Sequence, residues 1–566
     1  MTVNNENTFT MADAIVKELK REGVEVAFGI VSIHNMPIYD AILRDGSIHL
    51  VGARGESGAV NMADGYARAT GKIGVVITST GAGAGNTAGS LTEAWNRGVP
   101  LLHLSGDVAF PHLGTGKRYI HECKDQLQMM EGASKKAYHV KNPEQISSLM
   151  RHAIAEAKAL PSGPVTINMP IDFQSVIVPD TTFIDATPEV SKEALKPVHI
   201  PEEVVSEIAA AKRPTIWAGG GVLEANAMEE LTHFAEKIGA AVISGQSGKG
   251  AIREDHPQWI GHFATMPPTK ELFEKSDLFI SIGTKLRGNE TGNWTLPLSE
   301  NHIKIDLDIN AFNLSYPVKY GIVGDAKQVL KQLVEELDKK DVKADAAYIE
   351  EVENTRNKLR DNLRAAVHPY DKFVDVMREK APEDAIFVRD ITVPASLWGS
   401  RLFNIYQPNT NIYASGGGIG QGLPTAIGAQ VGARDKVVML MAGDGGFMLN
   451  VGELATAAQE ELPMIVLLFD DKGYGVLRGI QDDVYNRRVG VELFTPDFVT
   501  LGESMGFESV RIKDAEEFAE ELEKAIASKK PSMIVVDMNA VGPMASRGAT
   551  APDLVNNYIP KKRFED

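Results

Sequence analysis

Short apolar runs alternate with amphipathic helical stretches along the whole of this 566-residue chain. Runs such as residues 437–442 and 464–469 are continuously apolar, which is typical of strands buried on both faces of a parallel sheet. The helical stretches between the runs would cover those faces. The alternation therefore predicts an α/β fold made of doubly wound parallel sheets.

The length exceeds what a single hydrophobic core holds, so we expect several domains. The pattern divides into three blocks, at residues 1–185, 190–345 and 365–545, with a C-terminal tail at 546–566. A Pro-, Thr- and Asp-rich linker (179–188) ends the first block, and a charged helical stretch (338–364) is predicted to be a solvated connector. The predicted strands are 24–28, 74–77, 100–105 and 164–168; then 214–218, 241–244, 277–282 and 302–308; and finally 386–389, 411–414, 437–442, 464–469 and 532–537.

Composition excludes several classes of function. A net charge of −18 argues against nucleic acid as a partner, because binding a phosphate backbone requires clustered Lys and Arg. The single cysteine, Cys123, leaves no internal disulfide and no cysteine-based zinc site. No apolar run is long enough to span a bilayer, and residues 1–10 contain no apolar signal core. We therefore expect a cytoplasmic protein without a membrane partner.

Two acidic segments follow neighbouring predicted strands. Gly443-Asp444-Gly445 follows the run 437–442, and Asp470-Asp471-Lys472-Gly473 follows the run 464–469. Glycines at a helix start leave backbone N–H groups free for phosphate oxygens, and carboxylate oxygens suit Mg²⁺. Gly-Asp-Gly alone is more often only a turn. The two strand ends together favour a diphosphate held by a divalent cation.

These segments, with a spacer of about 24 residues between them, resemble the thiamine diphosphate motif of the superfamily of acetolactate synthases, benzoylformate decarboxylases and benzaldehyde lyases. The resemblance covers nearly the whole chain. It implies a thiamine diphosphate-binding fold in the first and third domains and a Rossmann-like fold in the central domain. The family usually has Asn-Asn where this chain has Asp470-Asp471, so the site carries added negative charge.

The resemblance also implies which residues hold the cofactors, thiamine diphosphate and Mg²⁺. The metal ligands would be Asp444, Asp471 and the backbone carbonyl of Gly473. Gly445, Gly446 and Tyr474 would complete the diphosphate side of the site.

Glu56 lies in a second matching segment, Ala-Arg-Gly-Glu-Ser-Gly-Ala at residues 53–59. By itself, a glutamate at a helix start is more often a carboxylate favoured by the helix dipole. The resemblance gives Glu56 a catalytic role, in which its carboxyl group would hydrogen-bond the pyrimidine ring and favour the tautomer that removes the C2 proton. Apolar burial would keep that carboxyl group protonated.

Two glycine-rich loops are further matches. Residues 415–424 (Ser-Gly-Gly-Gly-Ile-Gly-Gln-Gly-Leu-Pro) could form a dinucleotide loop or a flexible turn, since such patterns are weak alone. The resemblance implies that the Gly417 carbonyl accepts from the cofactor's 4′-amino group and that Ile419 forces its two rings into a bent shape. In the loop 80–86, Asn86 would lie near the pyrimidine ring. The family places Glu56 and the Gly443 motif on different subunits, which implies at least a homodimer, with a homotetramer expected.

Two histidines are candidates for contact with substrate. His34 aligns with the active-site histidine of benzaldehyde lyase, and His121 falls where several relatives have glutamine. A single histidine is more often structural. In the family role, each would protonate or orient the alkoxide that forms at the attacked carbonyl.

Departures from the family decide between possible activities. Leu477 stands where pyruvate decarboxylases of the yeast type have an acid, and their paired histidines are missing near residues 114–116. Both losses favour carboligation of 2-oxo acids and aldehydes, as in acetolactate synthase or benzaldehyde lyase. A simple 2-oxo acid decarboxylase and a 2-hydroxyacyl-CoA lyase are alternatives. Residues 285–290 differ from the flavin-binding element of acetolactate synthases, so FAD is not expected.

Two alternatives come from other classes. A nicotinamide dehydrogenase would need an acidic residue about 20 positions after a Gly-x-Gly-x-x-Gly turn, and no loop supplies that set. A non-catalytic homologue that only binds the cofactor is disfavoured by Glu56.

Overall fold

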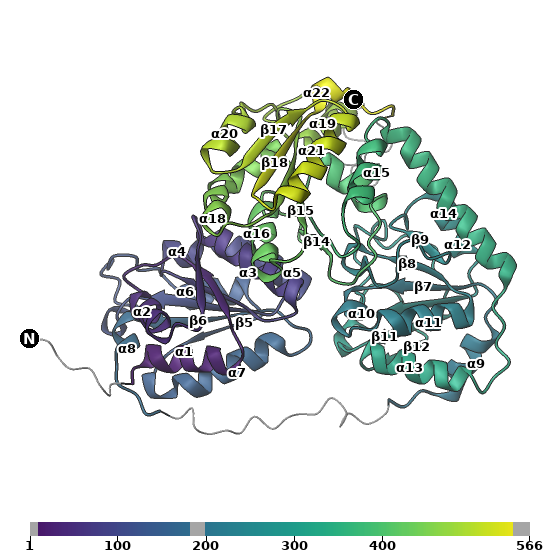
Figure 1. Cartoon of the computed structure of the whole chain (residues 1–566). Helices are drawn as coiled ribbons and strands as arrows, with labels where there is room; N and C mark the ends of the chain where they lie inside the picture. Colours follow the sequence, from purple (N-terminus) through teal and green to yellow (C-terminus); the bar gives the residue numbers. More distant parts are fainter. Residues whose placement is uncertain (1–8, 181–197, 547–566) are drawn as a thin grey trace, which may run out of the picture.

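The computed structural model describes residues 9–180 and 198–546, and their strands form three six-stranded sheets in which the paired strands are parallel (Figure 1). The linker predicted at 179–188 and the tail predicted at 546–566 lie almost entirely outside these residues. The α/β prediction is confirmed, and the domain boundaries stay predictions.

Each sheet contains strands from one stretch of the chain. The first contains β1 (Val26–Gly29), β2 (His49–Gly52), β3 (Gly74–Thr78), β4 (Leu101–Asp107), β5 (Lys136–His139) and β6 (Pro164–Pro170). The second contains β7 (Pro214–Ala218), β8 (Ala241–Ser244), β9 (Trp259–Gly261), β10 (Leu278–Ile282), β11 (His302–Asp306) and β12 (Tyr320–Val323). The third contains β13 (Ile386–Arg389), β14 (Asn411–Tyr413), β15 (Val438–Gly443), β16 (Ile465–Asp470), β17 (Glu508–Ile512) and β18 (Ser532–Asp537).

The outer two sheets share one topology. The first runs β2-β1-β3-β4-β6-β5, and the third runs β14-β13-β15-β16-β18-β17. The central sheet runs β12-β11-β10-β7-β8-β9, which is the Rossmann order read from its far edge. The predicted arrangement of two similar domains around a Rossmann-like one is therefore observed. Every predicted strand is present, and the sequence missed β2, β5, β9, β12 and β17.

Helices cover the faces of these sheets (Figure 1). In the first domain they are α1 (Met11–Arg21), α2 (Met36–Asp45), α3 (Glu56–Thr70), α4 (Ala82–Gly85), α5 (Ala88–Arg97), α6 (Gln126–Ala133), α7 (Ile146–Lys158) and α8 (Ile171–Gln174). The central part contains α9 (Glu202–Ala210), α10 (Gly220–Glu224), α11 (Met228–Ile238), α12 (Pro267–Glu274), α13 (Ala326–Leu337) and α14 (Ala346–Val367). The third domain contains α15 (Asp371–Lys380), α16 (Gly422–Gly432), α17 (Asp444–Phe447), α18 (Leu454–Gln459), α19 (Gly475–Tyr485), α20 (Phe498–Ser504), α21 (Ala515–Ser528) and α22 (Met538–Val541).

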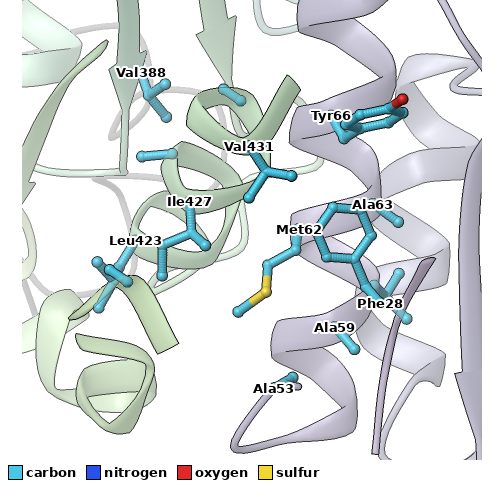
Figure 2. Packing of buried hydrophobic residues seen from close by; sticks show 14 of the residues in the cluster. Phe28, Ala53, Ala59, Met62, Ala63, Tyr66, Val388, Leu423, Ile427 and Val431 are labelled. Carbon is cyan, nitrogen blue, oxygen red and sulfur yellow. The ribbon is translucent and has the colours of Figure 1, made fainter. Parts of the chain in front are cut away.

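The first and third domains meet along α3 and α16, whose buried side chains belong to one hydrophobic cluster (Figure 2). Met62 and Tyr66 of α3 lie opposite Leu423, Ile427 and Val431 of α16. The helices approach so closely that a β-carbon on Gly65 would overlap the Thr425 carbonyl, and one on Gly428 would overlap the Met62 carbonyl. Glycine is required at both positions because only hydrogen fits between the two backbones.

The solvated connector predicted at 338–364 is wrong in part. The helix α14 buries one face, with Tyr348, Val352, Leu359, Leu363 and Val367 in a cluster that also contains residues of the central and third domains. The charged residues that suggested a solvated helix occupy its other face. Among the described helices, none is both long and apolar enough to cross a lipid bilayer.

Candidate functional site

Three neighbouring strands of the third sheet end in aspartates. Asp390 follows β13, Asp444 follows β15, and Asp470 is the last residue of β16. The strand order reverses between β13 and β15. Open α/β sheets bind ligands at such a reversal, outside the carboxyl ends of the strands. The third sheet therefore presents carboxylates where a ligand is expected.

Asp444 opens the short helix α17 and is buried, with 1% of its surface exposed. Neither of its carboxylate oxygens makes a well-formed hydrogen bond, and the nearby Gly445 amide only partly stabilises the charge. Burial, then repulsion from Asp471 and Asp470, raises the pKa of Asp444 to about 7. A buried carboxylate without partners is unfavourable, and a cation bound to it would remove that cost. This orphaned carboxylate fits the predicted Mg²⁺.

The other predicted ligands lie beside Asp444. Burial raises the pKa of Asp471, and its carboxylate is near enough to raise the pKa of Asp444. A β-carbon on Gly445 would lie 3.0 Å from the Gly473 carbonyl oxygen and 2.7 Å from the Tyr474 ring. No group of three or more His, Cys, Asp or Glu side chains suited to a metal occurs within residues 9–180 and 198–546. A cation here would need the Gly473 carbonyl and oxygens from phosphate or water.

The extra charge of Asp470-Asp471 is matched by nearby cations. Asp470 is 2.6 Å from the Lys472 ammonium and 3.1 Å from the Arg511 guanidinium, and Asp471 is 3.3 Å from that of Arg478. Asp470 is fully buried, whereas the Lys472 and Arg511 side chains are partly exposed, so solvent screens these pairs in part. The acid in place of the family's asparagine is thus compensated within this chain.

The glycine-rich loop at residues 415–422 lies next to α17. A β-carbon on Gly446 would lie 3.4 Å from the Gly420 nitrogen. Gly417 has a φ of +87°, which glycine adopts readily, and its carbonyl belongs to an exposed part of the loop. The Ile419 side chain is 38% exposed. The structure thus brings the Gly420 end of the loop that carries Gly417 and Ile419 close to Gly446 of α17, and the roles of Gly417 and Ile419 stay predictions.

Glu56 lies in the first domain, as the first residue of α3, and is partly exposed. The Asn86 side-chain amide donates to its Oε2 at 3.0 Å. A β-carbon on Gly83 would lie 3.1 Å from its Oε1. Glu56 and the loop that carries Asn86 therefore form one cluster at the end of β3, where the strand order of the first sheet reverses.

His34 and His121 lie next to each other, with ring centroids 5.3 Å apart. His34 is buried, and its Nδ1 has no hydrogen-bond partner. Burial and the charge of His121 lower the pKa of His34, and Asp107 opposes them in part. His121 has a φ of +64°, and a β-carbon on Gly81 would overlap its carbonyl. Although paired histidines are missing near residues 114–116, the fold creates a pair from distant positions.

Within the described part of the chain, no hydrogen bond or ion pair joins the Glu56 carboxylate to Asp444, Asp471 or the loop at Gly417. We call the Glu56 and Asp444 clusters the two half-sites. Large apolar side chains near both are exposed, which is unusual around a finished site. They are Val31, Ile33, Met36 and Ile120 in the first domain and Ile419, Leu449, Leu477 and Phe494 in the third.

Three buried acids that were not predicted from the sequence accept hydrogen bonds from the site's backbone. Asp390 accepts from the Gly420 and Gly422 amides, and Glu93 accepts from the Gly416 amide. Glu453 accepts from the Arg54 and Gly55 amides directly before Glu56. Asp390 could have been found from its place after a predicted strand. Glu93 and Glu453 each accept a hydrogen bond from a backbone amide in another domain, and no local sequence pattern indicates these contacts.

Three family models match the chain. They describe the thiamine pyrophosphate enzyme N-terminal TPP binding domain at residues 9–129, the central domain at 201–333, and the C-terminal TPP binding domain at 394–536.

Curated relatives match over nearly their full length. A probable acetolactate synthase large subunit of Methanococcus aeolicus is 32% identical, with 96% of this chain and 95% of the relative covered. A probable 2-ketoarginine decarboxylase of Pseudomonas aeruginosa is 31% identical over 94% of each chain. The acetolactate synthase large subunit of Corynebacterium glutamicum is 30% identical, with 96% and 90% covered.

Proposed function

The chain belongs to the thiamine pyrophosphate enzyme family, and from this premise we propose that it is a Mg²⁺-dependent carboligase for 2-oxo acids and aldehydes. The main support for a Mg²⁺ site is the Asp444 carboxylate. It is buried, makes no well-formed hydrogen bond and lies near Asp471 and the Gly473 carbonyl. Similarity to acetolactate synthase large subunits supports ligation as the reaction.

When bound, thiamine diphosphate supplies the carbon nucleophile and the electron sink for cleaving a bond beside a carbonyl. Asp444, Asp471 and the Gly473 carbonyl would hold Mg²⁺, and the N–H groups near Gly445 and Gly446 would bind phosphate oxygens. The Glu56 carboxyl group would hold a proton against the pyrimidine ring. Asn86 would orient Glu56 through the hydrogen bond that it already donates.

The fate of the substrate depends on proton supply. A proton delivered to the reacting carbon releases an aldehyde, whereas addition to a second carbonyl gives a ligation product. The side chain of Leu477 is half-exposed and supplies no proton. This absence of an acid at position 477 favours ligation.

A 2-oxo acid decarboxylase is the second candidate. It is supported by the similarity to a probable 2-ketoarginine decarboxylase and by the adjacent rings of His34 and His121, which could supply protons. The 2-hydroxyacyl-CoA lyase stays a prediction from the sequence alone.

Our proposal includes no FAD. Arg287, in the segment that differs from the flavin-binding element, donates to the Ser415 carbonyl at 3.0 Å. Glu290 of that segment is partly buried and accepts from the Gln246 amide. Arg287 therefore joins the central domain to the third, whereas Glu290 is engaged within the central domain.

Product analysis separates the two candidates. The protein would be incubated with thiamine diphosphate, Mg²⁺ and pyruvate, alone and then with benzaldehyde, and also with a guanidino-bearing 2-oxo acid. We expect CO₂ together with 2-hydroxy ketone products as the main outcome. Stoichiometric aldehyde without any ligated product would overturn the carboligase and favour the decarboxylase.

We propose that the active unit is at least a homodimer, with the Glu56 half-site of one chain facing the Asp444 half-site of its partner. The exposed apolar side chains around both half-sites support this arrangement, since association would bury them. A second copy related by two-fold symmetry would complete two sites at once.

Mixing two inactive variants tests this arrangement. Glu56→Gln and Asp444→Ala would be unfolded, mixed in equal amounts and refolded together. We expect about a quarter of wild-type activity, because half of random dimers are mixed and each has one intact site. Each variant refolded alone is the control. Refolded mixtures that contain mixed dimers but stay inactive would show that Glu56 and Asp444 act within one chain.

A further inference from the structure

The middle of the loop at residues 415–422 has few contacts of its own. No heavy atom lies within 4 Å of a β-carbon built on Gly417, and the Ile419 side chain is 38% exposed. A loop centre of this kind keeps its geometry only if its two ends are fixed. The described side chains around those ends include two buried carboxylates.

Glu93 of α5 holds the first end. Its Oε1 and Oε2 both accept from the Gly416 amide, at 2.8 and 2.7 Å, and the residue is 5% exposed. A β-carbon on Gly416 would lie 2.5 Å from Glu93 Oε2 and 3.3 Å from the Asn96 amide nitrogen. Burial raises the pKa of Glu93, and the nearby charge of Arg68 opposes this. Glycine at 416 and the acid at 93 thus fit together as a pair.

Arg68 supports the same end of the loop. It pairs with Asp64 at 2.7 Å and donates to the Tyr413 carbonyl, also at 2.7 Å. Both partners in the ion pair are nearly buried, so their geometry is fixed by packing as well as by charge. Arg68 and Glu93 come from the first domain, while the loop belongs to the third.

Asp390 holds the second end. Its Oδ1 accepts from the Gly420 amide at 3.0 Å and from the Ile391 amide at 2.6 Å, and its Oδ2 accepts from the Gly422 amide at 3.2 Å. Asp390 is 1% exposed. Hydrogen bonds to a carboxylate are stronger than those between neutral groups. Asn450 adds a fourth contact by donating to the Gly420 carbonyl at 2.7 Å.

We propose that Glu93 and Asp390 are positioning residues, which fix the loop on both sides of Gly417 and Ile419 and thereby set the place of the cofactor's pyrimidine ring. The proposal rests on the proposed function for its catalytic consequence. Neither residue would touch the diphosphate, which Asp444 and Asp471 would hold. The two carboxylates should therefore affect activation of the cofactor more than its retention.

The test uses Glu93→Gln and Asp390→Asn in the full chain. An amide of the same shape keeps one oxygen as a neutral acceptor, loses the charge that strengthens these hydrogen bonds, and places an NH2 donor where the second oxygen accepted. Glu18→Gln is the control, because Glu18 is equally buried and pairs with Arg151 at 2.6 Å away from the loop.

Amide hydrogen exchange of the peptide that spans the loop is measured first, without cofactor. We expect exchange at least about tenfold faster in both variants and unchanged in the control. Affinity for thiamine diphosphate with Mg²⁺ is then measured by calorimetry, and we expect a change within about threefold. Exchange of the cofactor's C2 proton, followed by NMR after acid quenching, should fall at least about tenfold in both variants.

Three outcomes decide the proposal. Loop exchange that is unchanged in the two variants, or equally faster in the control, overturns it. C2-proton exchange that falls only in proportion to affinity shows that the carboxylates act on retention, which also overturns it. A wild-type chain that binds no thiamine diphosphate overturns the proposed function and the catalytic role of the loop, whereas amide exchange still decides whether the carboxylates hold it.

Discussion

Replacing Glu56 with glutamine is expected to lower kcat by about 100- to 1000-fold. Glutamine keeps an oxygen that can accept from Asn86, so the cluster at the start of α3 should stay intact. It cannot hold a transferable proton against the pyrimidine ring. Steady-state kinetics with the substrate identified from product analysis gives the rate, and calorimetry with thiamine diphosphate and Mg²⁺ gives the affinity.

Cofactor affinity in Glu56→Gln should stay within about threefold of wild type, because the diphosphate side of the site is unchanged. The control is Glu131→Gln, on the exposed surface of α6 in the same domain, which should have wild-type rates. Near-normal turnover in Glu56→Gln would remove Glu56 from the catalytic role. Loss of affinity in parallel with rate would instead make it a binding residue.

Replacing Asp444 with alanine is expected to weaken thiamine diphosphate binding by at least about 100-fold, because removing a metal ligand costs more than removing the groups that support one. The measurement is calorimetric titration of the cofactor in excess Mg²⁺. The control is Asp435→Ala, an exposed position just before β15. Tight binding by Asp444→Ala would place the metal elsewhere.

The same substitution should make the protein without cofactor more stable. Burial and two neighbouring carboxylates raise the pKa of Asp444 from its usual value of 3.8 to about 7. The folded state therefore binds this proton more tightly than the unfolded state, so stability falls as pH rises between these values and stays reduced above them. At pH 8, Asp444→Ala should melt about 2–4 °C higher than wild type.

Mg²⁺ with thiamine diphosphate should reverse that order, since bound ligands stabilise only the chain that binds them. Melting curves at pH 4 and pH 8, with and without cofactor, measure both effects. Equal melting temperatures of the two proteins at pH 8 without cofactor would contradict the unfavourable charge at Asp444.

Strands in the middle of the sheets could be predicted from the sequence, and most outer strands could not. Five of the six outer strands were missed, namely β2, β5, β9, β12 and β17. A middle strand such as β3 or β16 is buried at every residue, and its sequence is apolar up to its last residue. An outer strand such as β17 has only its last residue, Ile512, buried, and its sequence, Glu-Ser-Val-Arg-Ile, is too polar to be recognised as a buried strand.

The candidate site divides in the same way. Residues carried by strand ends and glycine-rich loops, such as Asp444 and Gly417, could be predicted because their local pattern is distinctive. Glu93 could not, because it reaches Gly416 across 323 positions of sequence. That contact depends on how the first and third domains pack, and only the three-dimensional structure shows this. The prediction of a solvated connector at 338–364 failed for the same reason. The many charged residues of this segment gave no sign that one face of α14 is buried against other domains.

The close contact at Gly65 and Gly428 has a consequence for how this enzyme could be redesigned. The helix α3 begins at Glu56, and α16 begins at the end of the glycine-rich loop. A larger side chain at Gly65 or Gly428 would push the two helices apart and so displace both Glu56 and the loop. Libraries aimed at new substrates should therefore leave the crossing untouched. Leu477 and Ile120 are better starting points, since neither belongs to the cluster packed at this crossing.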